Sequence, residues 1–453
     1  MRSPNWAACR LGTRLVLVAM LAVATLAGGT LWAGFVQAPA VGGISIDGSG
    51  VVSNPLVADQ QQLLTFRETA LEEIPGDLNQ YTPLRKVSLR RLDEAIRKHS
   101  RTQPFPLPQE IIYLAGLQRI EYVFVYPEQR DIVIAGPAEG WQVDELGNLV
   151  GVTTQRPVLA LDDLMVALRT ARTTNGTGIT CSIDPTDEGV QRLRGLMSQL
   201  QTIGNPAVTM QRIEEALGPQ NVTVTGVPAT THFARVLVGA DFRMKRLAMD
   251  FEPAPIRGLP SFLEMIDAAP RGGQNVMPRW WLAAKYDPIV TDGDGLAFRF
   301  TETRVECLTE DDAVAADGSR QATGRKNAMA QRWAELMTEK YDELAQEDSA
   351  FGQLRSIMDL AVVGALLQKE GLVEFANLEI PALMHEQQVV QFTAPRRVAS
   401  KASFVKKGRN WIISASGGVK FAPWQMADEL HEDDAVLEDR KQAENAADRW
   451  WWN

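Results

Sequence analysis

The N-terminal segment constrains the folding of this chain most strongly, because it separates a leader from a folded body. An almost unbroken apolar run extends from Leu15 to Val36, and three arginines precede it, Arg2, Arg10 and Arg14. Ala38-Pro39-Ala40 follows, a small-residue triplet of the kind that signal peptidases cleave. The run is also long enough to span a bilayer as an uncleaved anchor. We therefore expect residues 1–40 to be a signal peptide or a signal anchor, and the rest to fold outside the cytoplasm, in the periplasm or cell envelope or as a secreted protein.

Two cysteines, Cys181 and Cys307, follow this leader. In an oxidising compartment an even pair can form a disulfide. Both lie in alternating stretches typical of strands, residues 179–183 and 304–308, where buried free thiols fit equally well. The sequence leaves both alternatives open, because only geometry decides between them.

The charge balance limits the classes of partner. The chain carries 46 Lys and Arg against 56 Asp and Glu, a net charge of −10. An acidic protein repels phosphate backbones and anionic lipids. We therefore expect no nucleic-acid partner, and membrane contact only through the N-terminal segment if it is uncleaved. An envelope protein or a polysaccharide remains as a partner class.

Local signals predict a mixed α+β fold. Strand, Asp-x-x-Gly turn and strand follow one another around Asp47 and Asp144, and more loosely around Asp292. Ser88 is a suitable N-cap for a helix with a stripe of leucines and isoleucine. Thr231 is a suitable N-cap for a long helix, and Asp184, followed by Pro185, for another.

These signals divide the body into regions. We expect β-hairpins plus an α/β sandwich, followed by a long helical pair and a small antiparallel sheet. The helical pair is expected to pack antiparallel, and its second helix, through residues 357–367, is apolar nearly all round and should be buried. The expected boundaries are 41–157 for a β-hairpin and helix region, 158–252 for the α/β sandwich, 253–325 for a strand-and-loop region, 326–423 for the helical pair with its sheet, and 424–453 for an acidic helical tail ending in Trp450-Trp451-Trp452.

Several blocks of sequence carry a family likeness when they are taken together: Glu121–Tyr126, Ala135–Trp141, Arg156–Leu159, Cys181–Pro185, Thr231–Leu237, Arg243–Lys245, Met277–Trp281, Trp333, Tyr341–Leu344 and Met358–Val362. In this combination the chain resembles the exported planctomycete family known as domain of unknown function 1598, from about Gly42 to about Gly418. The resemblance implies an envelope-associated or secreted bacterial protein. It implies no activity and no catalytic residues.

The candidate chemistry is sparse. His232, Arg243 and Arg246 lie on the helix predicted after Thr231, and we expect them to form an anion site, since Arg243 and Arg246 are three residues apart. The four histidines form no zinc-binding spacing, and the Asp292-Gly-Asp-Gly sequence lacks the closing Glu of a calcium loop, so we expect no metal and no cofactor. No nucleophile elbow or phosphate loop is present in the sequence.

The tryptophan pair Trp280-Trp281 is more informative. In a strand, neighbouring side chains point to opposite faces, so one ring should be buried and the other could line a groove for sugar or peptide. We therefore expect an exported, non-catalytic binding or structural module. The alternative is an exported hydrolase acting on a cell-surface polymer, which would show two carboxyl groups about 5 to 10 Å apart across a deep cleft.

Overall fold

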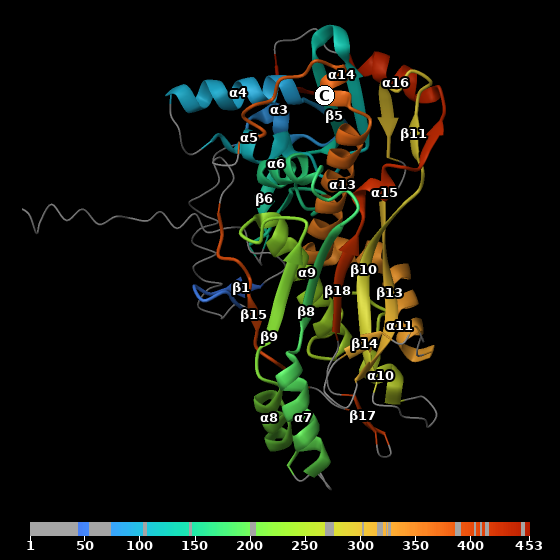
Figure 1. Ribbon diagram of the computed structural model, residues 1–453. Coiled ribbons are helices and arrows are strands. Elements are labelled where there is room, and N and C mark those ends of the chain that lie inside the picture. Colours follow the sequence, from blue (N-terminus) through green and yellow to red (C-terminus); the bar gives the residue numbers. More distant parts are fainter. Residues whose placement is uncertain are drawn as a thin grey trace, which may run out of the picture. The chain divides into compact units, whose positions relative to one another are not determined.

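A computed structural model describes the body of the protein (Figure 1). Its described residues are 44–53, 74–102, 107–144, 147–199, 205–267, 276–300, 303–314, 320–322, 324, 328–385, 391–402, 405–407, 410–412, 416–444 and 449–453. The predicted signal segment, residues 1–40, lies outside them. Residues 39–453 form one compact unit. The predicted mixed α+β class is confirmed.

A nine-stranded sheet is the largest element. Its order is β1 (Ser45–Ile46), β2 (Val51–Ser53), β15 (Arg397–Val398), β9 (Gln220–Thr225), β8 (Ile179–Asp184), β18 (Ser416–Phe421), β10 (Val276–Tyr286), β13 (Thr303–Val314) and β14 (Arg320–Ala322). Neighbouring strands are antiparallel except β15 with β2 and β10 with β18. Strands expected in four separate regions of the sequence therefore share one sheet.

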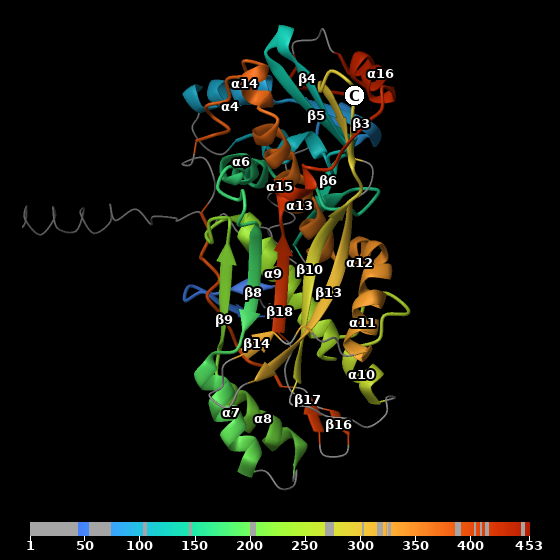
Figure 2. The same ribbon diagram turned by 45° about the vertical axis from the view of Figure 1, so that its right-hand side comes forward.

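Helices cover one face of this sheet, as Figure 2 shows for α9 (His232–Ala248) and α13 (Ser349–Lys369) behind the strands. The tryptophan pair separates as expected. Trp280 is fully buried on the covered face, with ring centroids 4.8 Å from both Phe262 and Trp333. Trp281 points to the opposite, open face. The prediction of one buried and one groove-facing ring is therefore confirmed.

A second, seven-stranded sheet has the order β19 (Leu430–Glu432), β11 (Ile289–Thr291), β12 (Ala297–Arg299), β4 (Tyr122–Tyr126), β5 (Asp131–Ala138), β3 (Thr82–Ser88) and β20 (Trp451–Trp452). Two further pairs are β6 (Trp141–Val143) with β7 (Leu149–Gly151), and β16 (Val405–Lys407) with β17 (Asn410–Ile412). The remaining helices are α3 (Gly76–Asn79), α4 (Leu89–Thr102), α5 (Gln109–Ile112), α6 (Leu161–Thr170), α7 (Asp187–Gln199), α8 (Pro206–Leu217), α10 (Phe262–Asp267), α11 (Ala328–Glu339), α12 (Tyr341–Glu347), α14 (Leu372–Phe375), α15 (Pro423–Met426) and α16 (Ala435–Ala443), with short 3₁₀ turns at Leu114–Gly116 and Pro127–Gln129.

The predicted Asp-x-x-Gly turns all join antiparallel strands. In the first, Asp47 Oδ1 accepts hydrogen bonds from the backbone N–H groups of Ser49 and Val51 at 2.8 and 3.0 Å. In the third, Asp292 Oδ1 accepts from the N–H groups of Leu296 and Ala297 at 2.7 and 3.1 Å. The Asp292 sequence is thus a hairpin turn, and the described residues contain no cluster of three or more metal-ligating side chains.

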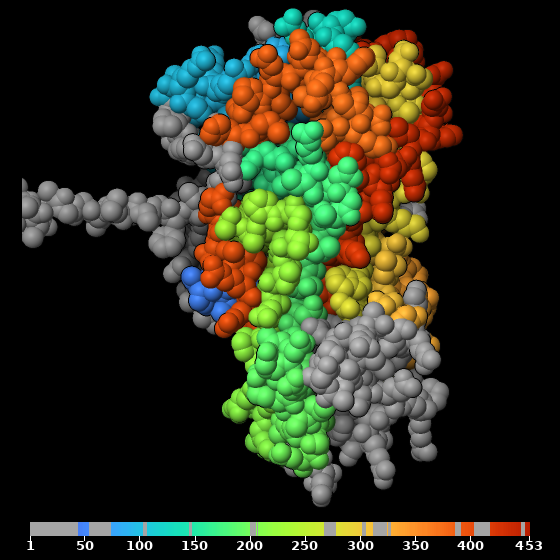
Figure 3. Space-filling view, in the orientation of Figure 1, coloured from blue at the N-terminus to red at the C-terminus, as the bar shows by residue number. Residues whose placement is uncertain are grey.

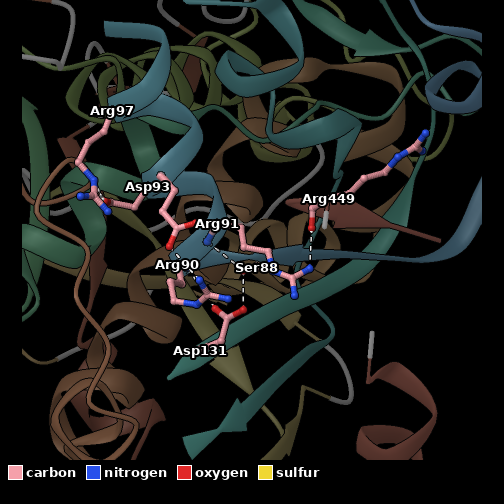
Figure 4. Close-up of polar contacts among 8 residues, drawn as sticks. Ser88, Arg90, Arg91, Asp93, Arg97, Asp131 and Arg449 are labelled. Carbon is pink, nitrogen blue, oxygen red and sulfur yellow. Dashed lines mark hydrogen bonds and ion pairs between the residues drawn. The ribbon is translucent and has the colours of Figure 1, made fainter. Parts of the chain in front are cut away.

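The predicted cap of α4 is confirmed and is part of a buried network (Figure 4). Ser88 Oγ accepts from the Arg91 N–H at 3.0 Å and donates to Asp131 Oδ2 at 2.5 Å. Asp131 comes from β5, is 2% exposed, and also accepts from the Arg90 N–H. Burial raises the pKa of Asp131 above its usual range. The helix start is therefore fixed to the second sheet by a side chain that is distant in sequence.

Two predicted helices require correction. α7 begins at Asp187, and Thr186 caps it by accepting from the Gly189 N–H at 3.0 Å, in place of the expected Asp184. The first helix of the expected pair is broken at Lys340 into α11 and α12. α11 packs on β13, whereas α12 packs on α13, which also packs on α6 and α9. Only the second part of the first helix therefore pairs with the buried α13.

The acidic tail also differs from its prediction. It is not one helix, because β19 pairs with β11 and β20 pairs with β3 on either side of α16. Trp451 is 7% exposed, and the guanidinium carbons of Arg85 and Arg449 lie 5.3 and 5.5 Å from the centre of its ring. The terminal tryptophans therefore pack back on the body.

Helix α13 is the one helix among the described residues that is long and apolar enough to cross a membrane. Its apolar window is 94% buried inside the protein. Full burial is typical of the core helix of a globular body. The prediction that this segment is apolar nearly all round and buried is confirmed.

The two cysteines lie too far apart for a disulfide. Cys181 pairs with Val419, Val419 with Leu282, and Leu282 with Cys307, so three strand spacings separate them. Three spacings amount to about 14 Å, whereas bridged cysteines have Cα atoms within about 7 Å of each other. Both are free and buried, and burial raises the pKa of each thiol. Of the two alternatives that the sequence left open, the structure contains the free thiols.

Candidate functional site

The open face of the nine-stranded sheet holds a groove of about 1120 Å³. Because directly paired residues share a face, the register defines which side chains line it. One row crosses five strands and consists of Thr223, Ser182, Gly418, Trp281 and Leu308. Figure 3 shows β8 and β9 at the surface beside β18 in red.

Glycine shapes the middle of this row. A Cβ atom on Gly418 would lie 1.8 Å from the Cys181 carbonyl oxygen, and one on Gly417 would lie 1.9 Å from the Trp280 carbonyl oxygen. Gly417 also has a φ of +118°, which L-residues rarely adopt. The two glycines thus allow β18 to lie close to β8 and β10. No side chain rises between Ser182 and Trp281, so the groove has a low floor beside the indole ring.

Aromatic and hydroxyl groups line the groove. Trp281 is half-buried, and the guanidinium carbon of Arg279 lies 4.8 Å from the centre of its ring. Leu308 beside it is 42% exposed. On the other side of the floor, the hydroxyl groups of Thr180 and Thr225 are 2.6 Å apart. The site therefore combines one flat aromatic surface with neutral hydrogen-bonding groups.

The charges that line the groove cancel. Arg279 and Lys420 supply two cations, and Glu306 and Glu310 supply two anions. The two glutamates are four residues apart on β13, with Leu308 between them. At about 3.3 Å per residue, their backbones are separated by about 13 Å.

A buried ion pair lies under the floor of the groove. Lys245 Nζ on α9 lies 2.9 Å from Asp241 Oδ1. The same ammonium donates to the carbonyl oxygens of Ile183 on β8 and Gly417 on β18, at 2.6 and 3.2 Å. Burial raises the pKa of Asp241, although the Lys245 charge opposes this shift. Lys245 therefore links the adjacent strands β8 and β18 of the groove to helix α9 through hydrogen bonds.

The residues of the predicted anion site are not all brought together. His232 and Arg243 are eleven residues apart on α9, which corresponds to about 16 Å along the helix. His232 Nδ1 lies 2.9 Å from Asp163 Oδ2 in the core. Burial would lower the pKa of His232, but the Asp163 carboxylate raises it above its usual value.

The two arginines of that prediction do converge, but on a glutamate. Arg246 Nε lies 2.7 Å from Glu252 Oε1, and Arg243 forms an ion pair with the same carboxylate. Arg243 Nε also lies 2.6 Å from Asp348 Oδ2. Anion binding by these three residues remains a prediction, with internal carboxylates already beside each of them.

Sequence reasoning missed most residues of the groove. Arg279 and Trp281 alternate along β10, and Glu306, Leu308 and Glu310 alternate along β13. This period of two marks one face of a strand. Alternation alone does not tell which strands are neighbours, so Lys420 and Ser182 could not be assigned to the same surface.

Comparison with known proteins gives one match. Residues 181–262 match the model of a family described as "Protein of unknown function (DUF1598)". The matched segment contains residues 181–184 of β8 and all of β9 and α9, and so includes Ser182 of the groove and the Asp241–Lys245 pair. No curated protein and no solved structure matches the chain.

Proposed function

We propose that this protein is an exported, non-catalytic binding module of the bacterial cell envelope, and that its groove holds an uncharged polysaccharide. The proposal rests on one observation. A row of side chains crosses five strands of the sheet, and in this row the Trp281 ring lies beside Gly418, which has no side chain. The leader-like N-terminal sequence and the likeness to an exported family support the location outside the cytoplasm.

The size and position of the groove favour a polymer. Pockets for small molecules usually enclose about 300 to 1,000 Å³, whereas this groove encloses about 1120 Å³. The strands that form it have neighbours on both sides, so their backbone groups are engaged in the sheet. A peptide therefore cannot add as an extra strand within the groove.

The chemistry of the lining favours carbohydrate. Two cations and two anions leave no net charge to select an ionic polymer. An indole ring offers a flat apolar surface, while hydroxyl, carboxylate and ammonium groups offer hydrogen bonds. The apolar faces and hydroxyl rims of sugar rings complement this pattern.

We expect Trp281→Ala to abolish most polysaccharide binding without unfolding the protein, because the ring is half-buried on an open face. Cosedimentation with insoluble chitin, cellulose and the sugar-polymer fraction of a bacterial wall measures the bound fraction. We expect the variant to lose at least about tenfold in affinity, since a buried aromatic contact contributes roughly 1.5 to 3 kcal/mol.

Tyr81→Ala is the matched control, because Tyr81 is an aromatic residue that is 53% exposed outside the groove. It should bind like the natural protein. Equal binding by both variants would contradict the proposal, as would the absence of binding to every polymer tested. Release of reducing ends during the assay would instead favour the hydrolase.

A further inference from the structure

A second cavity, of about 100 Å³, is lined by three arginines from distant parts of the chain. Arg119 follows the 3₁₀ turn at Leu114–Gly116, Arg156 follows β7, and Arg355 lies on α13. The cavity shares no lining residue with the groove. A cavity of this volume is several times the space that one water molecule needs.

The guanidinium groups of this cavity retain unused donors. Arg119 Nε and Nη2 and Arg355 Nε are buried and have no hydrogen-bond partner among the described residues. Arg119 Nε lies 3.9 Å from Glu121 Oε1, at the limit of an ion pair, and Arg355 Nη2 lies 2.5 Å from the exposed Asp342. Burying a donor without a partner costs about 1 to 3 kcal/mol each, so the arrangement is better suited to a bound group.

An acceptor lies beside these donors. Gln118 is 4% exposed, and its Nε2 donates to Glu139 Oε1 and Thr154 Oγ1 at 2.9 and 2.6 Å. These two bonds fix the amide so that Oε1 is left buried without a partner among the described residues. Asp359, the one carboxylate that lines the cavity, accepts from the Tyr286 hydroxyl at 2.8 Å.

We propose that this cavity binds a phosphate group, either free inorganic phosphate or the phosphate of a monoester. Three guanidinium groups from different elements present forked N–H donors, which match the oxygens of phosphate better than a single lysine does. The acceptor Gln118 Oε1 suits the P–OH of a protonated phosphate. Arg119 and Arg355 contribute buried donors, and the exposed Arg156 also lines the cavity.

The test uses the full-length protein with sodium phosphate, glucose 6-phosphate and sodium chloride at matched ionic strength. Isothermal titration and the melting temperature measure binding. We expect both phosphates, but not chloride, to bind and raise the melting temperature. Tighter binding of glucose 6-phosphate would identify a phosphate monoester as the ligand. Tighter binding of inorganic phosphate would identify the free ion as the ligand. Either result supports the proposal.

Arg119→Gln should weaken phosphate binding at least about tenfold. Arg156→Gln should weaken it as well, and because that side chain is exposed this variant tests the site even if Arg119→Gln fails to fold. Arg332→Gln is the matched control, since Arg332 is an exposed helical arginine outside the cavity, paired with Glu335. Absence of phosphate binding by the natural protein would overturn the proposal, and so would unchanged binding in Arg156→Gln.

Discussion

Replacing Lys245 with methionine is expected to destabilise the protein by about 3 to 5 kcal/mol near pH 8, because it leaves the buried Asp241 carboxylate without its partner. Asp241 is fully buried, and the carbonyl oxygens of Ile183 and Gly417 lose a donor at the same time. Urea unfolding followed by circular dichroism measures the change. The groove depends on the same lysine, so polysaccharide binding should fall with stability.

The cost of Lys245→Met should depend on pH. Burial already raises the pKa of Asp241 above its value in the unfolded chain, and losing the lysine raises it further. A raised carboxyl pKa means that the folded state holds a proton that the unfolded state releases, so stability is lost as the pH rises from about 4 towards the folded pKa. We therefore expect a smaller destabilisation at pH 5 than at pH 8.

The double variant Asp241→Leu with Lys245→Met provides the control. Removing both charges avoids an unpaired ion, so the double variant should be more stable at pH 8 than Lys245→Met alone. An equal cost at both pH values, or a double variant that is less stable than the single one, would show that this pair does not fasten the strands as described.

Substitution of Gly417 is the second large effect that we expect. In Gly417→Ala the new Cβ would lie 1.9 Å from the Trp280 carbonyl oxygen, at a φ of +118°. Backbone strain of about 1 to 3 kcal/mol and overpacking of about 1 to 3 kcal/mol should combine to about 2 to 6 kcal/mol. The contact joins β18 to β10, so the strain falls on the floor of the groove.

Gly176→Ala is the matched control for that substitution. Gly176 also has a positive φ, of +78°, but a Cβ there would meet no atom within 4 Å. It should therefore show the backbone strain without the overpacking. Thermal and urea unfolding of the two variants separate the cost of backbone strain from the cost of overpacking. Equal losses of stability in both variants would mean that the close approach of β18 to β10 is unimportant.

Local signals in the sequence predicted much of the secondary structure. Ser88 and Thr231 cap their helices as expected, because a side-chain oxygen satisfies a nearby backbone N–H wherever the chain turns into a helix. The hairpin turns at Asp47, Asp144 and Asp292 were also predicted correctly, because they too depend on residues that are close in sequence. Before α7, both Asp184 and Thr186 could act as the N-cap. The structure uses Thr186, and the local sequence pattern does not distinguish the two.

Long-range pairing was not predictable in the same way. β18 lies between β8 and β10, although more than two hundred residues separate Ser182 from Gly418. No short-range rule specifies that contact, because strand pairing follows burial and packing across the whole sheet. The two faces of Trp280-Trp281 followed from alternation, whereas the groove beside Trp281 required the position of β18.

The most direct measurement of the central claim is hydroxyl-radical footprinting with and without a saturating polysaccharide identified by cosedimentation. We predict that Trp281 and Leu308 lose reactivity in the complex, while Tyr81 and Phe375, which are 53% and 60% exposed elsewhere, keep theirs. Unchanged reactivity of Trp281 and Leu308 in a protein that is fully bound to polymer would contradict the account.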